Sequence, residues 1–267
     1  MPWRKTKDPY RIVVSEIMLQ QTQVARVEKY YGPFVRRFPD FCSLVRSDAR
    51  DVVRAWAGLG YNRRALSLWR LAIAVSEKYD GRLPCQRDTL EKLPGIGKAT
   101  AGAIMAFAFN MPEPFIETNI RRVFIHFFFP GWKKVNDAAI MPIVVRALDR
   151  DNAREWYWAL MDYGAMLGRY AAKKKIRNPN VRSAHYKRQS KFSGSDREVR
   201  GKILRILLAR EKVSVDAVAR EFKQPPKRLR KIITDLIREG FLSKKGRMVS
   251  FSKLHRLDDR PSGGVVR

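Results

Sequence analysis

Cysteine and histidine are scarce in this chain of 267 residues, which holds two cysteines and three histidines. Cys42 and Cys85 lie far apart in the sequence, so they supply neither a disulfide framework nor the four thiolates of an iron–sulfur cluster. The histidines show no spacing typical of metal ligands. We therefore expect no metal site and no cofactor, and an intracellular, reducing compartment.

Long apolar runs and acidic residues are also in short supply. No run of about 18 apolar residues exists and no signal-peptide pattern precedes Asp8, which predicts no membrane span and no membrane partner. Asp and Glu number 26 against 55 Lys and Arg, giving a formal net charge of +29. A surface charged for thermostability would add Glu together with Lys, so the imbalance favours nucleic acid as the partner. We expect a cytoplasmic, nucleoid-associated protein.

The chain divides by pattern into a helical part and a smaller basic part. Residues 1–168 show successive helical patterns broken by Gly and Pro, for instance at Gly32-Pro33, and no sustained strand alternation, which predicts an all-α domain. Residues 169–194 contain many Lys and Arg with interleaved aromatics and no acidic residue. We expect an extended basic linker that contacts phosphates; the alternative is a merely solvated segment.

Residues 195–253 carry three helical patterns, the first capped by Asp196, followed by a two-strand hairpin, the order of a small α+β winged helix-turn-helix domain. We expect the third helix to present Lys227, Arg228 and Lys231 to DNA phosphates. A winged helix that binds protein is the alternative, which the basic composition disfavours. Residues 254–267 are expected to form a disordered tail.

Residues 93–104 read Leu-Pro-Gly-Ile-Gly-Lys-Ala-Thr-Ala-Gly-Ala-Ile. Gly95 and Gly97 allow a turn that side chains would block, and a helix of small residues follows at once. The turn would point backbone N–H groups at one DNA phosphate, with Lys98 and Thr100 beside it, and a monovalent cation is a further candidate ligand of this hairpin. The alternative is a turn that simply caps a helix.

Three more segments carry specific motifs: Ser-Glu-Ile-Met-Leu-Gln-Gln-Thr-Gln-Val within residues 2–24, Gly-Leu-Gly-Tyr-Asn-Arg-Arg-Ala at 58–65, and Phe-Ile-Glu-Thr-Asn-Ile-Arg-Arg-Val at 115–123. Together with the glycine turn they resemble the helix-hairpin-helix (HhH-GPD) DNA glycosylases, most closely the MutY-type adenine glycosylases, over about residues 2–168. The resemblance implies an all-α domain of two helical subdomains. It also implies a monomer that flips a mispaired adenine, opposite guanine or 8-oxoguanine, out of double-stranded DNA and hydrolyses its N-glycosidic bond.

The resemblance implies that Glu16 is the acid that protonates the adenine ring, and partial burial in an apolar helix would raise its pKa. A second carboxylate near the sugar would stabilise the positive charge that develops there. The family has Asp at that place, whereas this chain has Glu117, whose extra methylene displaces the carboxylate by roughly 1 Å. The alternative for Glu117 is a helix cap.

The resemblance assigns further roles. The base pocket would be lined by Trp3, Arg4, Asn119 and Asp162. The wedge that fills the space left by the flipped base, and that reads the opposite base, would be Gln20, Gln21 and Tyr61, although Tyr61 could instead be a core residue beside a helix start. DNA phosphates would be held by Asn62, Arg63 and Arg64.

Several departures from the family limit what it implies. Bifunctional relatives have a lysine where this chain has Ala99, and Lys98 lies one step earlier, about 100° around the helix, so we expect a monofunctional enzyme. The four cluster cysteines that follow the equivalent of Gly168 are missing. A winged helix replaces the family's NUDIX-like domain, and the chain begins without the helix that precedes Trp3 in the family. A glycosylase for thymine or uracil opposite guanine, or for another damaged base, and a non-catalytic DNA-binding protein remain alternatives.

Overall fold

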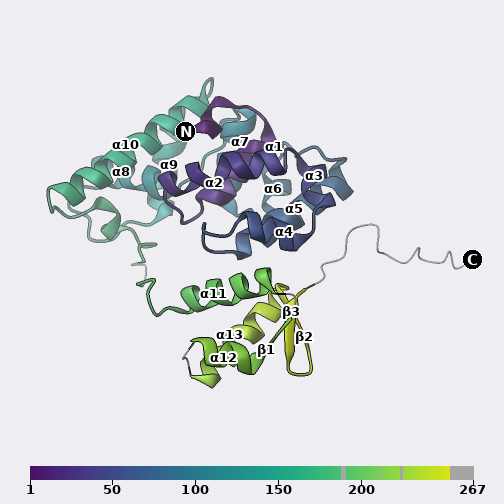
Figure 1. Ribbon diagram of the computed structural model, residues 1–267. Helices are drawn as coiled ribbons and strands as arrows, with labels where there is room; N and C mark the ends of the chain where they lie inside the picture. The colour runs from purple at the N-terminus through teal and green to yellow at the C-terminus, as the bar shows by residue number, and fades with distance from the viewer. Residues whose placement is uncertain (188–190, 211, 223–224, 253–267) are drawn as a thin grey trace, which may run out of the picture. The chain divides into compact units, whose positions relative to one another are not determined.

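The computed structural model describes residues 1–187, 191–210, 212–222 and 225–252 (Figure 1). Contacts within the chain group it into two compact units. One consists of Met1–Pro2, Ile17–Leu83 and Ser190–Arg267, and the other of Trp3–Glu16 and Pro84–Gln189. The expected tail at 254–267 lies outside the described residues.

The N-terminal two thirds of the chain, up to Lys173, is helical, as the sequence predicts. The elements are a 3-10 helix η1 (Pro2–Lys5) and the α-helices α1 (Pro9–Leu19), α2 (Val24–Arg37), α3 (Phe41–Arg46), α4 (Ala49–Ala55), α5 (Arg63–Tyr79), α6 (Arg87–Glu91), α7 (Lys98–Phe109), α8 (Thr118–Phe128), α9 (Asp137–Ala147) and α10 (Ala153–Lys173). No described helix has the length and apolarity needed to cross a bilayer.

One expected helix break is wrong. Helix α2 continues through Gly32-Pro33, with Pro33 exposed on its outer side. Proline removes one backbone N–H and disturbs one turn, a cost that tertiary packing can offset. Val27, Tyr31 and Phe34 are buried along one face of α2, and their burial holds the helix together across the proline.

The second unit is built around α7, whose residues from Ala101 to Ala108 are all buried. Gly102 faces the side chain of Phe115, and a Cβ at Gly102 would lie 2.5 Å from the Phe115 Cβ. Helices α8 and α10 approach each other equally closely, since a Cβ at Gly164 would lie 2.3 Å from the carbonyl oxygen of Asn119. Small residues at these crossings set the spacing of the helices that carry the site.

The C-terminal elements are α11 (Asp196–Ala209), β1 (Lys212–Ser214), α12 (Val215–Phe222), α13 (Pro226–Arg238), β2 (Leu242–Lys245) and β3 (Met248–Phe251). The strands form an antiparallel sheet in the order β1-β3-β2, with Val213 opposite Val249 and Ser243 opposite Ser250. The hairpin was expected, but β1 was not, because three residues are too few to show an alternating pattern. Ser195, not Asp196, caps α11.

The expected extended linker differs from the structure in its first half. Helix α10 runs on to Lys173, and a 3-10 helix, η2 (Pro179–Arg182), packs against α8. Ser183 then forms an isolated bridge with Val135. The lysines of this segment are exposed, as its basic composition predicts. The composition did not indicate that polar residues bind the segment to the helical domain.

Candidate active site

Glu16 lies on α1, surrounded by the buried residues of that helix, and its own side chain is half-buried. Burial, together with the nearby charge of Glu117, raises the pKa of Glu16 to about 8, although the charge of Arg4 lowers it in part. At neutral pH the carboxyl group is therefore mostly protonated. The sequence-based prediction of a raised pKa agrees with this geometry, and Glu16 is able to donate a proton.

Glu117 is the N-cap of α8. Its Oε1 accepts hydrogen bonds from the backbone N–H groups of Asn119 at 2.6 Å and Ile120 at 2.9 Å, while its Oε2 lies 3.5 Å from the Asn119 Nδ2. Burial raises the pKa of Glu117, whereas these two N–H groups and the charges of Arg121 and Arg122 lower it. Glu117 thus caps the helix through Oε1, as the alternative interpretation of the sequence expects, and its Oε2 lies beside Asn119.

The two carboxyl groups therefore lie in different surroundings, and the charge of Glu117 acts on Glu16. Glu16 has Arg4 as its favourable charge, whereas Glu117 has two backbone donors and the positive end of the α8 dipole. Pairs of carboxyl groups whose surroundings separate their protonation states can act as acid and anion in one reaction. This arrangement can protonate a leaving group and stabilise a positive charge next to it.

Arg4 and Asp162 meet across the unit in a bidentate ion pair, with Nη1 to Oδ2 at 2.6 Å and Nη2 to Oδ1 at 2.8 Å. The Arg4 guanidinium also lies 5.3 Å from the ring centre of Trp158. Trp3 is a core residue with only 6% of its surface exposed, so at most its edge is accessible to a base. Of the other expected pocket residues, Arg4 acts on Glu16 through its charge, Asp162 pairs with Arg4, and Asn119 contacts Glu117.

The three expected wedge residues lie in two turns of the first unit. Gln21 and Tyr61 both have left-handed backbones, with φ of 54° and 47°, which non-glycine residues adopt at a cost. Gln21 is exposed, and Gln20 and Tyr61 are half-buried. Strained turns of this kind persist only where their surroundings hold them.

Arg64 holds both turns, a role that sequence reasoning missed. Its guanidinium is buried, and Nη1 donates to the carbonyl oxygens of Ile17, Met18 and Gln20 at 2.9, 2.7 and 2.7 Å. Its Nη2 donates to the Gly60 carbonyl and the Thr22 hydroxyl, both at 2.9 Å. The predicted phosphate contact is therefore wrong for Arg64, because its donors are used internally.

The neighbouring residues remain candidates for phosphate contact, since Asn62 is half-buried and Arg63 is exposed. In the glycine turn, Gly95 has φ of +85°, Gly97 caps α7 and Ile96 is buried beneath the turn. Lys98 is exposed on the first turn of α7, and Thr100 is half-buried. The turn has the geometry that the sequence predicts for an anion site at a helix start.

The C-terminal basic residues divide into two kinds. Lys227 and Lys231 are exposed at the start of α13. Arg228 is half-buried and donates to the Asp196 carboxylate at 2.8 Å and to the Gly194 carbonyl at 2.6 Å. These contacts tie Arg228 to the start of α11, which differs from the expectation that it faces DNA.

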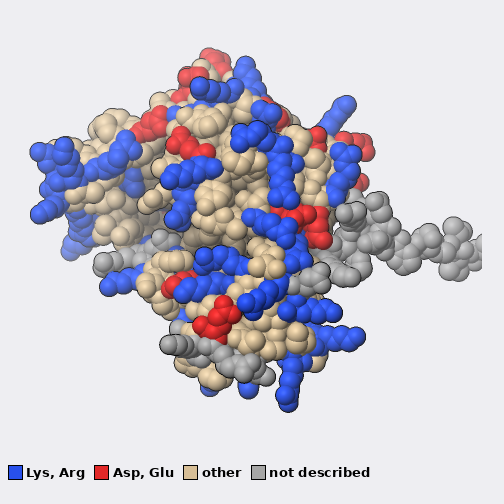
Figure 2. Space-filling view, viewed as in Figure 1, with Lys and Arg blue, Asp and Glu red and all other residues tan. Residues whose placement is uncertain are grey.

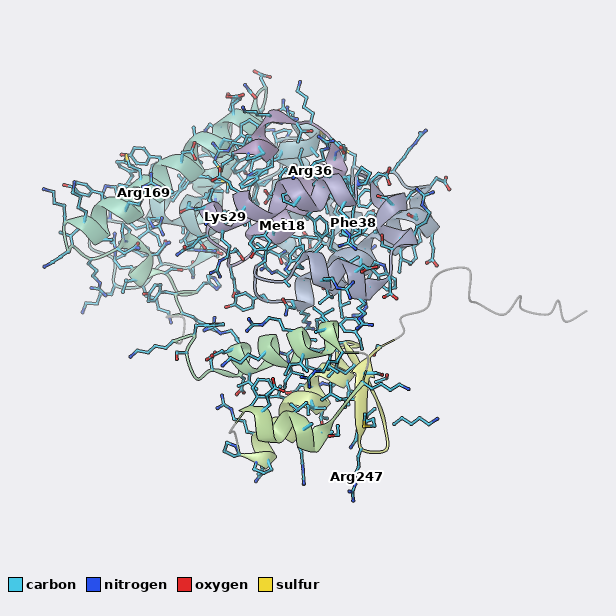
Figure 3. The ribbon with its side chains drawn as sticks, in the orientation of Figure 1. Met18, Lys29, Arg36, Phe38, Arg169 and Arg247 are labelled. Atoms are coloured by element: carbon cyan, nitrogen blue, oxygen red, sulfur yellow. The ribbon has the colours of Figure 1, made fainter. Side chains whose placement is uncertain are left out.

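Positive charge is spread over the protein surface. Figure 2 shows Lys and Arg side chains across most of the visible face, with Asp and Glu in small groups. In Figure 3, Arg247 points away from the turn between β2 and β3, and Arg169 lies on α10. Such a surface suits a polyanion with many phosphates.

The residues that follow α10 do not fit an iron–sulfur cluster, because the two cysteines of the chain are Cys42 and Cys85 and neither lies in that segment. Within the described parts of the chain, no three or more His, Cys, Asp or Glu side chains are arranged to hold a metal ion. The monovalent cation at the glycine turn stays a prediction.

Comparison with known proteins gives a consistent set of relatives. The model of the HhH-GPD superfamily base excision DNA repair proteins matches residues 14–227. An adenine DNA glycosylase of Mycolicibacterium smegmatis is 34% identical over 226 residues, covering 78% of this chain and 75% of the relative. One of Buchnera aphidicola subsp. Baizongia pistaciae is 36% identical over 171 residues, and there the chain spans 48% of the relative, about half its length.

A second group of relatives carries a different name. A thymine/uracil-DNA glycosylase of Methanothermobacter thermautotrophicus is 30% identical, covering 62% of this chain and 76% of the relative. The solved structure of a thermostable thymine-DNA glycosylase superposes with a TM-score of 0.59 at 30% identity, over 63% of this chain and 79% of that one. A trapped endonuclease III–DNA covalent intermediate shares the fold, with a TM-score of 0.52 at 22% identity over 61% of this chain and 74% of that one.

Proposed function

The chain belongs to the HhH-GPD superfamily of base excision DNA repair proteins, and we propose that it is a monofunctional DNA glycosylase that removes adenine mispaired with guanine or 8-oxoguanine. The observation that carries this proposal is the pair of Glu16 and Glu117. Burial and the charge of Glu117 keep Glu16 protonated at neutral pH, and Glu117 itself accepts two helix N–H bonds. The similarity to two bacterial adenine DNA glycosylases supports the choice of base.

In the proposed reaction the bond between C1′ of the deoxyribose and the adenine nitrogen breaks, and its electron pair goes to the base. Glu16 donates its proton to a ring nitrogen of the leaving adenine. The sugar becomes an oxocarbenium-like cation, which the Glu117 carboxylate stabilises until water adds to C1′ and gives a proton to the Glu16 carboxylate. Arg4, Asp162 and Asn119 would line the space around the base.

DNA binding would use several surfaces. The glycine turn at Gly95–Gly97, with Lys98 and Thr100, would hold one phosphate, and Asn62 and Arg63 others. Gln20, Gln21 and Tyr61 would fill the space of the flipped base. We propose that α11 to β3 form a winged helix-turn-helix domain, whose element order and sheet support this, and that Lys227 and Lys231 contact DNA phosphates. The partner is double-stranded DNA with a mismatch or lesion, bound by a monomer in the cytoplasm without a cofactor.

The absence of lyase chemistry is proposed from residue 99. Ala99 cannot form a Schiff base with the sugar, and Lys98 lies on a different side of the first turn of α7. Borohydride treatment of the protein with abasic DNA should give no covalent complex. A trapped complex that Lys98→Ala abolishes would contradict this.

Thymine or uracil opposite guanine is the second candidate substrate. A thymine/uracil-DNA glycosylase and the structure of a thymine-DNA glycosylase, each 30% identical to this chain, favour it. Both candidate functions would use the same fold and the same pair of Glu16 and Glu117. They differ in the contacts that the base pocket makes with the flipped base.

Base release under single-turnover conditions tests the proposal. The duplexes would contain adenine opposite 8-oxoguanine or guanine, and thymine or uracil opposite guanine, with strand breaks read before and after hot alkali. Alkali-dependent release of adenine that Glu16→Gln abolishes is the expected result. Release of a pyrimidine alone would transfer the function to the second candidate. Binding without any release would indicate a DNA-binding protein that lacks the chemistry.

A further inference from the structure

The segment after α10 binds the helix that carries the second carboxylate. We call residues 176–184 the strap. Asn180, near its centre, is 5% exposed, and its Nδ2 donates to the carbonyl oxygen of Thr118 at 2.8 Å. Thr118 is the first residue of α8 and directly follows Glu117. The buried side chain of Asn180 thus reaches the turn on which the Glu117 carboxylate depends.

Asn178 makes a second connection. Its Oδ1 accepts from the Asn180 backbone N–H at 3.0 Å and from the Nε of Arg122 at 3.2 Å. Arg122 in turn donates through Nη1 to the Asn119 Oδ1 at 2.8 Å and to the carbonyl oxygen of Gly164. A chain of polar contacts therefore runs from the strap through Arg122 and Asn119 to the cap of α8.

The other end of α8 is held by the same strap. Arg182 donates through Nη2 to the carbonyl oxygen of Ile125 at 3.1 Å and through Nη1 to that of Phe129. The end of a helix leaves carbonyl groups without partners inside the helix, and a guanidinium satisfies them well. Because both ends of α8 are bound by one short segment, the position of the helix start follows from the strap.

This anchoring matters for the chemistry. Glu has one more rotatable bond than the Asp expected at this place, so its carboxylate is less confined by its own backbone. The chain has no cysteines after α10 with which a cluster could tie this region together. The Oδ1 of Asn180 is buried and has no hydrogen-bond partner within the described residues. Burying it without a partner costs free energy, which the hydrogen bond from Nδ2 to α8 offsets.

We propose that Asn178 and Asn180 are positioning residues for the reaction: through Thr118, Arg122 and Asn119 they hold the start of α8, and with it the carboxylate of Glu117. This proposal rests on the proposed function for its effect on rate. It does not require adenine rather than thymine as the substrate.

The test uses the full-length chain with Asn178→Ala, Asn180→Ala and Asn178→Asp. Asn178→Asp keeps an oxygen that accepts from Arg122, so it is the conservative rescue. Asn136→Ala is the matched control, because Asn136 caps α9 through the Ala139 N–H and is not part of the strap. Single-turnover base release gives the rate of the chemical step, and titration with mismatch DNA gives the affinity.

We expect both alanine variants to lower the chemical rate roughly 10- to 100-fold with unchanged affinity for DNA, since small displacements at a reacting centre cost this much. Asn178→Asp and Asn136→Ala should keep the wild-type rate. Wild-type rates in both alanine variants, or equal losses in Asn178→Asp and Asn178→Ala, would overturn the proposal.

A second measurement needs no catalysis and separates this proposal from the proposed function. Hydrogen exchange of the Asn119 and Ile120 amides reports the two N–H groups that Glu117 accepts. Their exchange should accelerate in Asn178→Ala and not in Asn136→Ala. If the wild-type chain releases no base, the proposed function fails, while this exchange still decides whether the strap holds α8. Unchanged exchange would refute it even in an active enzyme.

Discussion

Arg64 offers the sharpest test of how the first unit is held together. Replacing it with Met keeps much of its length and apolar stem but removes every donor. Nη1 would no longer bridge the carbonyl oxygens of Ile17, Met18 and Gln20, and Nη2 would no longer reach Gly60. Burial lowers the pKa of Arg64 to about 10, so the side chain is charged at neutral pH.

The expected loss follows from these contacts. Hydrogen bonds from charged donors contribute about 1.5–3 kcal/mol each and are not additive, and breaking a buried charged network costs about 3–5 kcal/mol. For a chain of this size we therefore expect Arg64→Met to lower Tm by about 10 °C. Arg64→Lys keeps a charge but cannot span both turns, so its Tm should lie between those of the wild type and Arg64→Met.

Arg63 provides the control, because it is the adjacent arginine on the same helix start and is exposed. Arg63→Met removes the same charge and should change stability by less than about 0.5 kcal/mol. Thermal unfolding followed by circular dichroism at neutral pH measures all three variants. Equal Tm values for Arg64→Met and Arg63→Met would refute the claim that Arg64 holds the two turns.

Three other predictions follow from the structure. Burial raises the pKa of Glu16 from 4.5 to about 8, so its ionisation opposes folding increasingly as the pH rises between these values. Glu16→Gln should therefore raise Tm at pH 8, leave Tm unchanged near pH 4 and abolish base release. An equal gain in Tm at both pH values would contradict this. Gly164→Ala should destabilise the chain by about 1–3 kcal/mol in urea unfolding, since its Cβ would lie 2.3 Å from the Asn119 oxygen, whereas Gly201→Ala, with nothing within 4 Å, should not. Neutralising the exposed Lys173–Lys175 together should reduce the slope of log affinity for DNA against log salt by up to about 3, and an unchanged slope would show that these lysines stay in solvent.

Much of the site was predictable because its signals are local. The Gly95–Gly97 turn needs only neighbouring residues, since glycine adopts the positive φ of Gly95 without strain and a helix begins immediately after Gly97. The apolar residues around Glu16 on one helix predicted its raised pKa. Comparison confirms the resemblance to HhH-GPD proteins, which these motifs carried.

Other features required residues distant in sequence. Strand β1 exists because it pairs with β3, and its three residues are too few to predict pairing with a strand that lies beyond two helices in the sequence. Pro33 indicated a break, yet buried side chains kept α2 continuous. The strap lies within residues 169–194, whose many Lys and Arg predict a linker, while the two asparagines that fix the strap are common turn residues.

The family and the helical class follow from the sequence alone, because a motif records backbone geometry and residue chemistry within a few positions. Only the tertiary structure decided which of two adjacent arginines is buried, that Glu117 caps a helix, and that Asn178 and Asn180 hold that helix. Arg63 and Arg64 are chemically the same, and they differ only in which carbonyl groups the folded chain brings within reach. Hydrogen-bond partners and desolvation come from distant segments, and these decide what a charged side chain does.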